Sequence, residues 1–164
     1  MRLFAFLPVL FLAGSLPGQT AKAGEPPFTV TIAAEQAAAK IGSPIIIHIV
    51  LRANSEKTLT IPEARHDGTH GEYNYRVSVV GPKRISPPDT KHGRNMKKGT
   101  EVRTLTSTII KYLNKGDELT EDVDLQNVVS ITEPGDYVVQ VERADPAFAS
   151  MHIKSNKLAL HVGP

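Results

Sequence analysis

Residues 45–51 read IIIHIVL, a run in which every residue except His48 is apolar. Isoleucine and valine are branched at Cβ and pack well on a pleated surface, so this run favours a β-strand over a helix. Because both faces of such a strand are apolar, we expect it to lie in the middle of a sheet with both faces covered. The sequence therefore predicts a central strand here.

Stretches on either side of this run alternate between apolar and polar residues. In residues 28–33, for example, Phe28, Val30 and Ile32 are separated by polar or small residues. Alternation with a period of two is typical of a strand with one buried face. The expected strands cover residues 28–33, 45–51, 58–61, 73–79, 102–113, 137–143 and 157–162, with turn-rich segments such as NKGD and EPGD between them. About seven strands at this spacing predict an all-β fold, an antiparallel β-sandwich.

One segment permits a second interpretation. Residues 33–40, AAEQAAAK, are rich in alanine and favour a helix, but they continue the strand-like residues TVTI. A strand that crosses from one sheet to the other fits the segment equally well.

The first residues have the features of a secretory signal peptide. Arg2 precedes an apolar run at residues 3–13, and the small residues Ala21 and Ala23 stand before Gly24 at a cleavage position. The run is too short for a membrane-spanning helix, and Pro8 interrupts it. We therefore expect residues 1–23 to be removed, leaving residues 24–164 as a single extracytoplasmic domain, periplasmic or secreted, without a membrane span.

Composition narrows the classes of function. The chain has no Cys, which excludes disulfides, thiol catalysis and Cys-ligated metals. Its 19 basic and 17 acidic residues become equal in number once Arg2 and Lys22 are removed, so no excess of positive charge favours nucleic acid. The sequence contains neither a G-x-S-x-G nor an S-x-x-K motif, and no glycine-rich phosphate loop. We expect a protein that is not an enzyme.

The stretch ITEPGDYVVQV, residues 131–141, carries a family resemblance. Pro134 and Gly135 precede Tyr137 at the head of an alternating strand, which resembles the tyrosine corner of immunoglobulin-like and fibronectin type III sandwiches. The segment from Leu113 to the C-terminus also resembles the last strands of Ig-like domains in bacterial secreted and cell-envelope proteins. The resemblance implies an Ig-like β-sandwich in which Tyr137 packs inside and its hydroxyl bonds to the backbone. It implies no particular partner, because this fold carries many functions.

A basic segment interrupts the strands. Residues 81–101 contain six basic residues, Lys83, Arg84, Lys91, Arg94, Lys97 and Lys98, and two acidic ones, Asp89 and Glu101. Loops of this length are usually functional or disordered. One interpretation is a binding loop for an anionic envelope component or protein, with contacts from Lys91, Arg94, Lys97 and Lys98. The alternative is a solvated insertion, and the absence of an aromatic residue weakens nucleic-acid and carbohydrate partners alike.

An acidic segment follows. Residues 117–145 contain nine carboxylates and a single basic residue, Arg143. Carboxylates suit Ca²⁺, but GDELTEDVD lacks the spacing of an EF-hand, so an acidic, soluble turn is the preferred interpretation.

Histidines offer a possible metal site. His66 and His70 lie in ARHDGTHGE, and imidazole with carboxylate suits Zn²⁺ or Cu²⁺. The pairs Met96 with His92 and Met151 with His152 would suit copper. The sequence thus predicts a non-catalytic binding or accessory module of the cell envelope without a cofactor. The alternative is an envelope Zn or Cu protein that uses His66 and His70.

Overall fold

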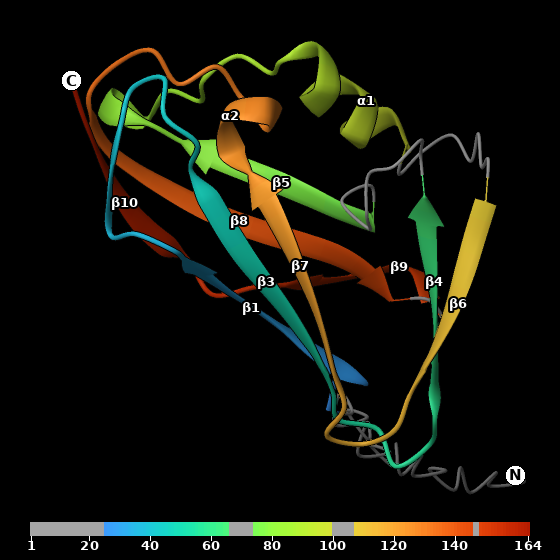
Figure 1. The fold of residues 1–164 in the computed structure, drawn as a ribbon. Helices are drawn as coiled ribbons and strands as arrows, with labels where there is room; N and C mark the ends of the chain where they lie inside the picture. Colours follow the sequence, from blue (N-terminus) through green and yellow to red (C-terminus); the bar gives the residue numbers. More distant parts are fainter. Residues whose placement is uncertain (1–24, 66–73, 100–106, 146–147) are drawn as a thin grey trace, which may run out of the picture.

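The structure is a computed structural model, which describes residues 25–65, 74–99, 107–145 and 148–164. The fold is mostly β, and its sheets are antiparallel except for one strand pair (Figure 1). The strands are β1 (Phe28–Ala34), β2 (Ala38–Lys40), β3 (Ile46–Ala53), β4 (Leu59–Arg65), β5 (Tyr75–Val80), β6 (Ser107–Leu113), β7 (Glu118–Asp124), β8 (Gly135–Asp145), β9 (Phe148–Lys154) and β10 (Leu158–Gly163). The helical segments are η2 (Pro82–Arg84), α1 (Lys91–Gly99) and α2 (Leu125–Val128).

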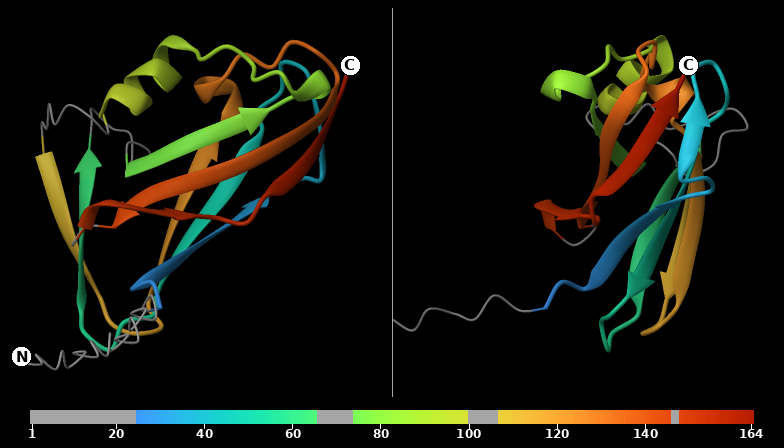
Figure 2. Two further views of the ribbon diagram at one scale, coloured as in Figure 1. Left: turned by 180° about the vertical axis from the view of Figure 1, so that it is seen from behind. Right: turned by 90° about the vertical axis from the view of Figure 1, so that its left-hand side faces the viewer.

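The strands form three sheets in the described part of the chain. The first has the order β1-β3-β7, the second has the order β2-β10-β8-β5 with β9 paired to β8, and the third consists of β4 and β6. The strands of the first two sheets run at an angle to each other, and the two sheets pack together (Figure 2). The all-β prediction is therefore confirmed, and the described part adds β2, β7 and β9 to the seven expected strands.

Residues 33–40 are the crossover between the two sheets and not a helix. β1 pairs with β3 in the first sheet, whereas β2 pairs in parallel with β10 in the second. The strand switch lets one continuous segment contribute an edge to each sheet.

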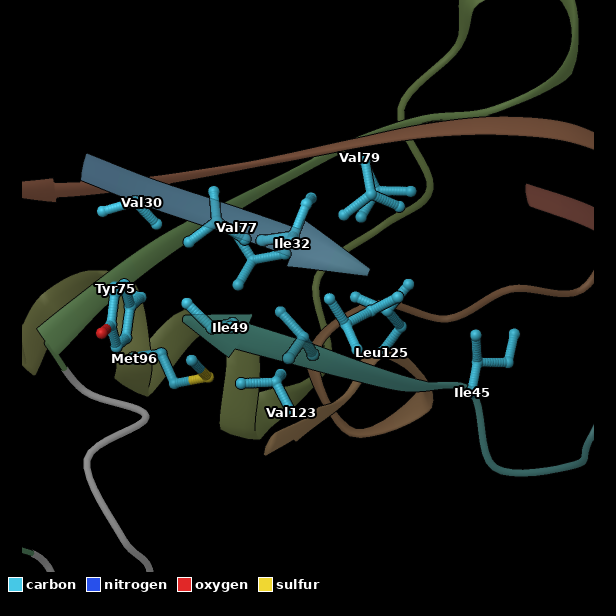
Figure 3. Close-up of a cluster of buried hydrophobic side chains, with 14 of the residues drawn as sticks. Val30, Ile32, Ile45, Ile49, Tyr75, Val77, Val79, Met96, Val123 and Leu125 are labelled. Carbon is cyan, nitrogen blue, oxygen red and sulfur yellow. The ribbon is translucent and has the colours of Figure 1, made fainter. Parts of the chain in front are cut away.

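The core lies between the two sheets and follows the period-two pattern. Phe28, Val30 and Ile32 of β1 are buried while the residues between them are not, and Val77 and Val79 of β5 repeat the pattern. Figure 3 shows Val30, Ile32, Val77 and Val79 converging with side chains of β3, α1 and α2. Burial of aliphatic side chains is the main stabilising contribution in a chain without disulfides.

The third sheet is a folded-back continuation of the first. β3 pairs with β7, and β4 pairs with β6, so the segment from Ile46 to Arg65 runs beside the segment from Ser107 to Asp124 throughout. Both segments bend sharply between the two sheets, where Ala53 donates its N–H to the carbonyl of Asp117 at 3.0 Å. The β4–β6 arm therefore returns along the side of the domain (Figure 1).

Tyr137 has the buried ring and the backbone hydrogen bond that the sequence predicts for it. Its hydroxyl donates to the carbonyl oxygen of Glu133 at 2.6 Å, and its ring is buried in the core. Gly135 has a φ of 145°, which favours glycine, and a Cβ there would lie 2.5 Å from Cγ of Pro82. Pro134 is exposed on the turn before the strand.

Two expectations about polar segments were wrong. The basic segment is not one long loop, because it contains η2 and the helix α1. The acidic segment is not only a turn, because Glu118–Asp124 form β7 and pair with β3 along their whole length.

Candidate functional site

Helix α1 presents the basic residues that the sequence singles out. It forms after Thr90, whose Oγ1 accepts the backbone N–H of Gly93 at 2.9 Å in the manner of an N-cap. Met96 on the inner side is buried beside Tyr75 (Figure 3), and the backbone of Gly93 lies directly against the carbonyl of Val128 in α2. The helix is thus fixed to the domain through its apolar side, although only Met96 is a large apolar residue.

The structure separates the predicted basic residues into distinct groups. Lys91 and Arg94 are exposed on α1, one turn apart. Arg94 donates from Nη1 to the backbone carbonyl oxygen of Asp89 at 2.7 Å. Because this acceptor is neutral, the hydrogen bond does not compensate the positive charge of the guanidinium.

Lys97 is a different case. Its Nζ lies 2.7 Å from both carboxylate oxygens of Asp89, so its charge is compensated within the protein. Lys97 is therefore paired within the protein, and its contact with a partner stays a prediction. The backbone of Lys98 belongs to α1, and its side chain lies outside what the structure describes.

Two further basic residues of the segment lie at η2. Lys83 and Arg84 are exposed, and neither side chain has an ion pair or hydrogen bond with the described residues. They follow β5, whereas α1 lies at the other end of the 85–90 connection, so the two groups are apart (Figures 1 and 2).

The predicted histidine pair cannot be placed. His66 and His70 lie outside the described residues, and metal binding by them stays a prediction. In the part of the chain that the structure describes, no group of three or more His, Asp or Glu side chains is arranged for a metal ion. Met96 is buried in the core, which removes its thioether from any surface copper site with His92.

The acidic segment conceals a buried charge pair that sequence reasoning missed. Glu121 of β7 is 8% exposed and Arg143 of β8 is 4% exposed, and Oε1 and Nη1 lie 3.8 Å apart. The guanidinium of Arg143 also stands over the ring of Tyr75, with its central carbon 4.8 Å from the ring centre. The period-two alternation of β7 could have indicated that Glu121 is buried, because Glu121 falls between the inward residues Leu119 and Val123.

Among the described residues, no helix is both long and apolar enough to cross a membrane. No known protein family and no curated protein matches the chain.

The structural comparison finds chains of the β-glucosidase from Listeria innocua. The structure in complex with isofagomine has a TM-score of 0.44 and 14% identity, and the match covers 84% of this chain and 16% of that one. The structure with gluconolactone has a TM-score of 0.43 at the same identity and coverage. The chain therefore spans about a sixth of the enzyme's length, and a similarity at this level assigns it neither a family nor an activity.

Proposed function

We propose that this protein is a non-catalytic binding module of the cell envelope, with an Ig-like sandwich fold, that binds an anionic partner through helix α1. The observation that carries the proposal is that Lys91 and Arg94 are exposed on a helix docked against the core. A docked helix presents charges in one arrangement, so less conformational entropy is lost on binding than from a free loop.

The Ig-like fold is supported by the corner at Tyr137. Its hydrogen bond to the carbonyl of Glu133 has the pattern of the tyrosine corner, in which a tyrosine hydroxyl bonds to the backbone a few residues upstream. Two packed sheets built mainly of antiparallel strands agree with this assignment.

An anionic protein or envelope polymer suits this surface better than nucleic acid does. The described residues of the basic segment include no Phe, Tyr or Trp side chain on which a base could stack. The helix carries only a few open positive charges, whereas binding to nucleic acid draws on many phosphate contacts.

The test uses a charge-matched pair of variants. We would replace Lys91, Arg94 and Lys98 with Gln, which keeps helix propensity, and leave Lys97 to its partner Asp89. The control replaces Lys40, Lys57 and Lys157 with Gln. These three lysines are exposed elsewhere on the domain, and their replacement removes the same amount of charge. Dextran sulfate and poly-glutamate serve as probes, with binding measured by fluorescence anisotropy between 0.01 and 0.15 M salt.

We expect the wild type and the control to bind and the α1 variant to lose most of its affinity. Binding should weaken with salt, because the Debye length falls from about 30 Å to about 8 Å over this range. Equal affinity of all three proteins, or affinity that survives both the α1 substitutions and salt, would rule out α1 as the binding surface.

The proposed location has its own test. If residues 1–23 are a signal peptide, mass spectrometry of the protein from the extracytoplasmic fraction should find Gly24, or a residue within a few positions of it, at the N-terminus. Recovery of intact Met1 from that fraction would contradict export by cleavage.

A further inference from the structure

The turn that follows β5 has an unusual backbone for its sequence. Lys83 and Arg84 have φ values of 59° and 61°, and the N–H of Ile85 donates to the carbonyl of Pro82 at 3.2 Å. Two central residues with positive φ inside such a hydrogen bond form a type I′ turn, which strongly favours Asn-Gly. Lysine and arginine are poor residues for these two positions, because their Cβ atoms crowd the backbone in the left-handed region.

The surrounding structure holds this turn in place. The N–H of Gly81 donates to the carbonyl of Ile85 at 2.8 Å, which closes the turn at its base. A Cβ at Gly81 would lie 2.7 Å from Cε1 of Tyr137, and Pro82 packs against Gly135 just as closely. Tyr137 and Gly135 of the tyrosine corner therefore pack directly against the first residues of the turn. Strain of this kind persists where the surroundings over-determine a conformation, and it is concentrated at functional sites.

The strained turn presents charge beside apolar surface. Lys83 and Arg84 are exposed and have no ion pair among the described residues, and Ile85 is 65% exposed. Val80, the last residue of β5, pairs across the strands with Val138 of β8, and both are exposed on the outer face of the sheet. Two cations and Ile85 thus lie within a few residues of the Val80–Val138 pair, and the hydrogen bond from Gly81 to Ile85 fixes the backbone between them.

We propose that this surface, formed by residues 82–85 together with Val80 and Val138, docks an acidic segment of another protein. Carboxylates of the segment pair with Lys83 and Arg84, and its aliphatic side chains cover Ile85 and the two valines. A protein segment supplies both features, whereas an anionic polysaccharide supplies charge without aliphatic surface. The site shares no residue with the α1 surface and does not depend on the function proposed for it.

The central variant replaces Lys83 with Asn and Arg84 with Gly, the pair that a type I′ turn favours. It removes both charges while keeping the turn, so its thermal midpoint should equal or exceed that of the wild type. A control with Lys57→Asn and Lys157→Asn removes two exposed charges elsewhere. A third variant, Ile85→Ser, keeps both charges and removes apolar surface.

The probe is a synthetic library of labelled twelve-residue peptides that combine Glu or Asp with Leu, Ile or Val in a serine background, selected on the wild-type protein. Poly-glutamate and vesicles of phosphatidylcholine with phosphatidylglycerol at a ratio of three to one are the competing probes. Affinities are measured by fluorescence anisotropy and co-sedimentation, on the full-length mature chain.

The selected peptides should contain both acidic and aliphatic residues. We expect the Asn-Gly variant to lose about tenfold or more in affinity, the Ile85→Ser variant to lose less, and the Lys57/Lys157 control and the α1 variant to bind normally. This result, together with an undiminished thermal midpoint of the Asn-Gly variant, would establish the turn as a docking surface. It would also show that Lys83 and Arg84 stabilise the fold less than Asn-Gly does at the same positions.

Several results would overturn the proposal. They are the absence of any peptide that distinguishes the wild type from the Asn-Gly variant, poly-glutamate that loses as much affinity in the Asn-Gly variant as the selected peptides do, and stronger binding to vesicles through the same residues. A lower midpoint for the Asn-Gly variant would refute the argument from strain, and Lys83→Gln with Arg84→Gln would then test the charges alone.

Discussion

Arg143 of β8 and Glu121 of β7 place opposite charges inside the core, with 3.8 Å between Nη1 and Oε1. Arg143 also donates from Nη2 to the carbonyl oxygen of Pro62 in β4 at 3.3 Å. One buried guanidinium therefore contacts all three sheets. The β4–β6 arm has this link and the buried side chain of Ile61 to hold it against the rest of the domain.

Removal of one member of this pair should be costly. Arg143→Met removes the charge that Arg143 places beside the buried Glu121 carboxylate, and we expect a loss of about 3–5 kcal/mol in the free energy of unfolding. The double variant Arg143→Met, Glu121→Leu should recover much of the loss, because no buried charge remains. Urea denaturation measures both. A loss in the double variant equal to the sum of the losses in Arg143→Met and in Glu121→Leu alone would show that the two side chains are not coupled.

The tyrosine corner should stabilise the fold. Tyr137→Phe removes the hydrogen bond to the carbonyl of Glu133 and should cost about 1 kcal/mol. Tyr137→Ala also removes the buried ring and should cost about 3–5 kcal/mol. Tyr112→Phe, at an exposed position of β6, is the control. Unchanged denaturation midpoints in both Tyr137 variants would contradict a structural role.

Tyr137 should also make stability sensitive to alkaline pH. Burial, with the carboxylate of Glu133 as a smaller cause, raises the pKa of Tyr137 above its usual 10.0. The folded protein therefore holds this proton more tightly than the unfolded chain does. The stability from this linkage is fully present below about pH 10 and is lost as the pH rises through the folded pKa.

Chemical denaturation between pH 8 and 11 tests this dependence. We expect a smaller alkaline loss of stability in Tyr137→Phe than in the wild type, and no such difference for Tyr112→Phe. Parallel curves for the wild type and Tyr137→Phe would show that Tyr137 does not contribute to the pH dependence.

Docking of α1 should depend on Gly93. A Cβ at this position would lie 2.0 Å from the carbonyl oxygen of Val128, so Gly93→Ala must displace the helix or α2. We expect a loss of about 1–3 kcal/mol despite the higher helix propensity of alanine. Asn95→Ala, at an exposed position of the same helix, should change stability by less than about 0.5 kcal/mol. A neutral or stabilising Gly93→Ala would mean that α1 is not packed here.

The strands were predictable because their signal is local. Alternation in residues such as Phe28, Val30 and Ile32 is visible in any short window, and it corresponds to the burial of one face of β1. The turn chemistry around Gly135 similarly indicated where Tyr137 would stand. The same rule could have shown β7, but the many carboxylates of ELTEDVD hid the alternation, and Glu121 is an inward residue only because Arg143 faces it.

Helix α1 could not be predicted because its stabilisation is not in its own sequence. KHGRNMKKG has one large apolar residue, and the helix forms where Met96 is buried and where Gly93 allows close contact with Val128. The isolated segment would be too short and too polar to hold a helix. The pairing of Lys97 with Asp89 depends on the same fold, since the two residues are eight positions apart and meet only because the chain turns into α1.

The sequence by itself determined the all-β class, most of the strands and the tyrosine corner, because period-two burial and turn residues act over a few neighbouring positions. The tertiary structure alone decided that the crossover at residues 33–40 joins two sheets and that Arg143 and Glu121 meet in the core. It also decided which cations of the basic segment are open and which are paired. These features depend on contacts between segments far apart in the chain, and such contacts exist only when the sheets have packed.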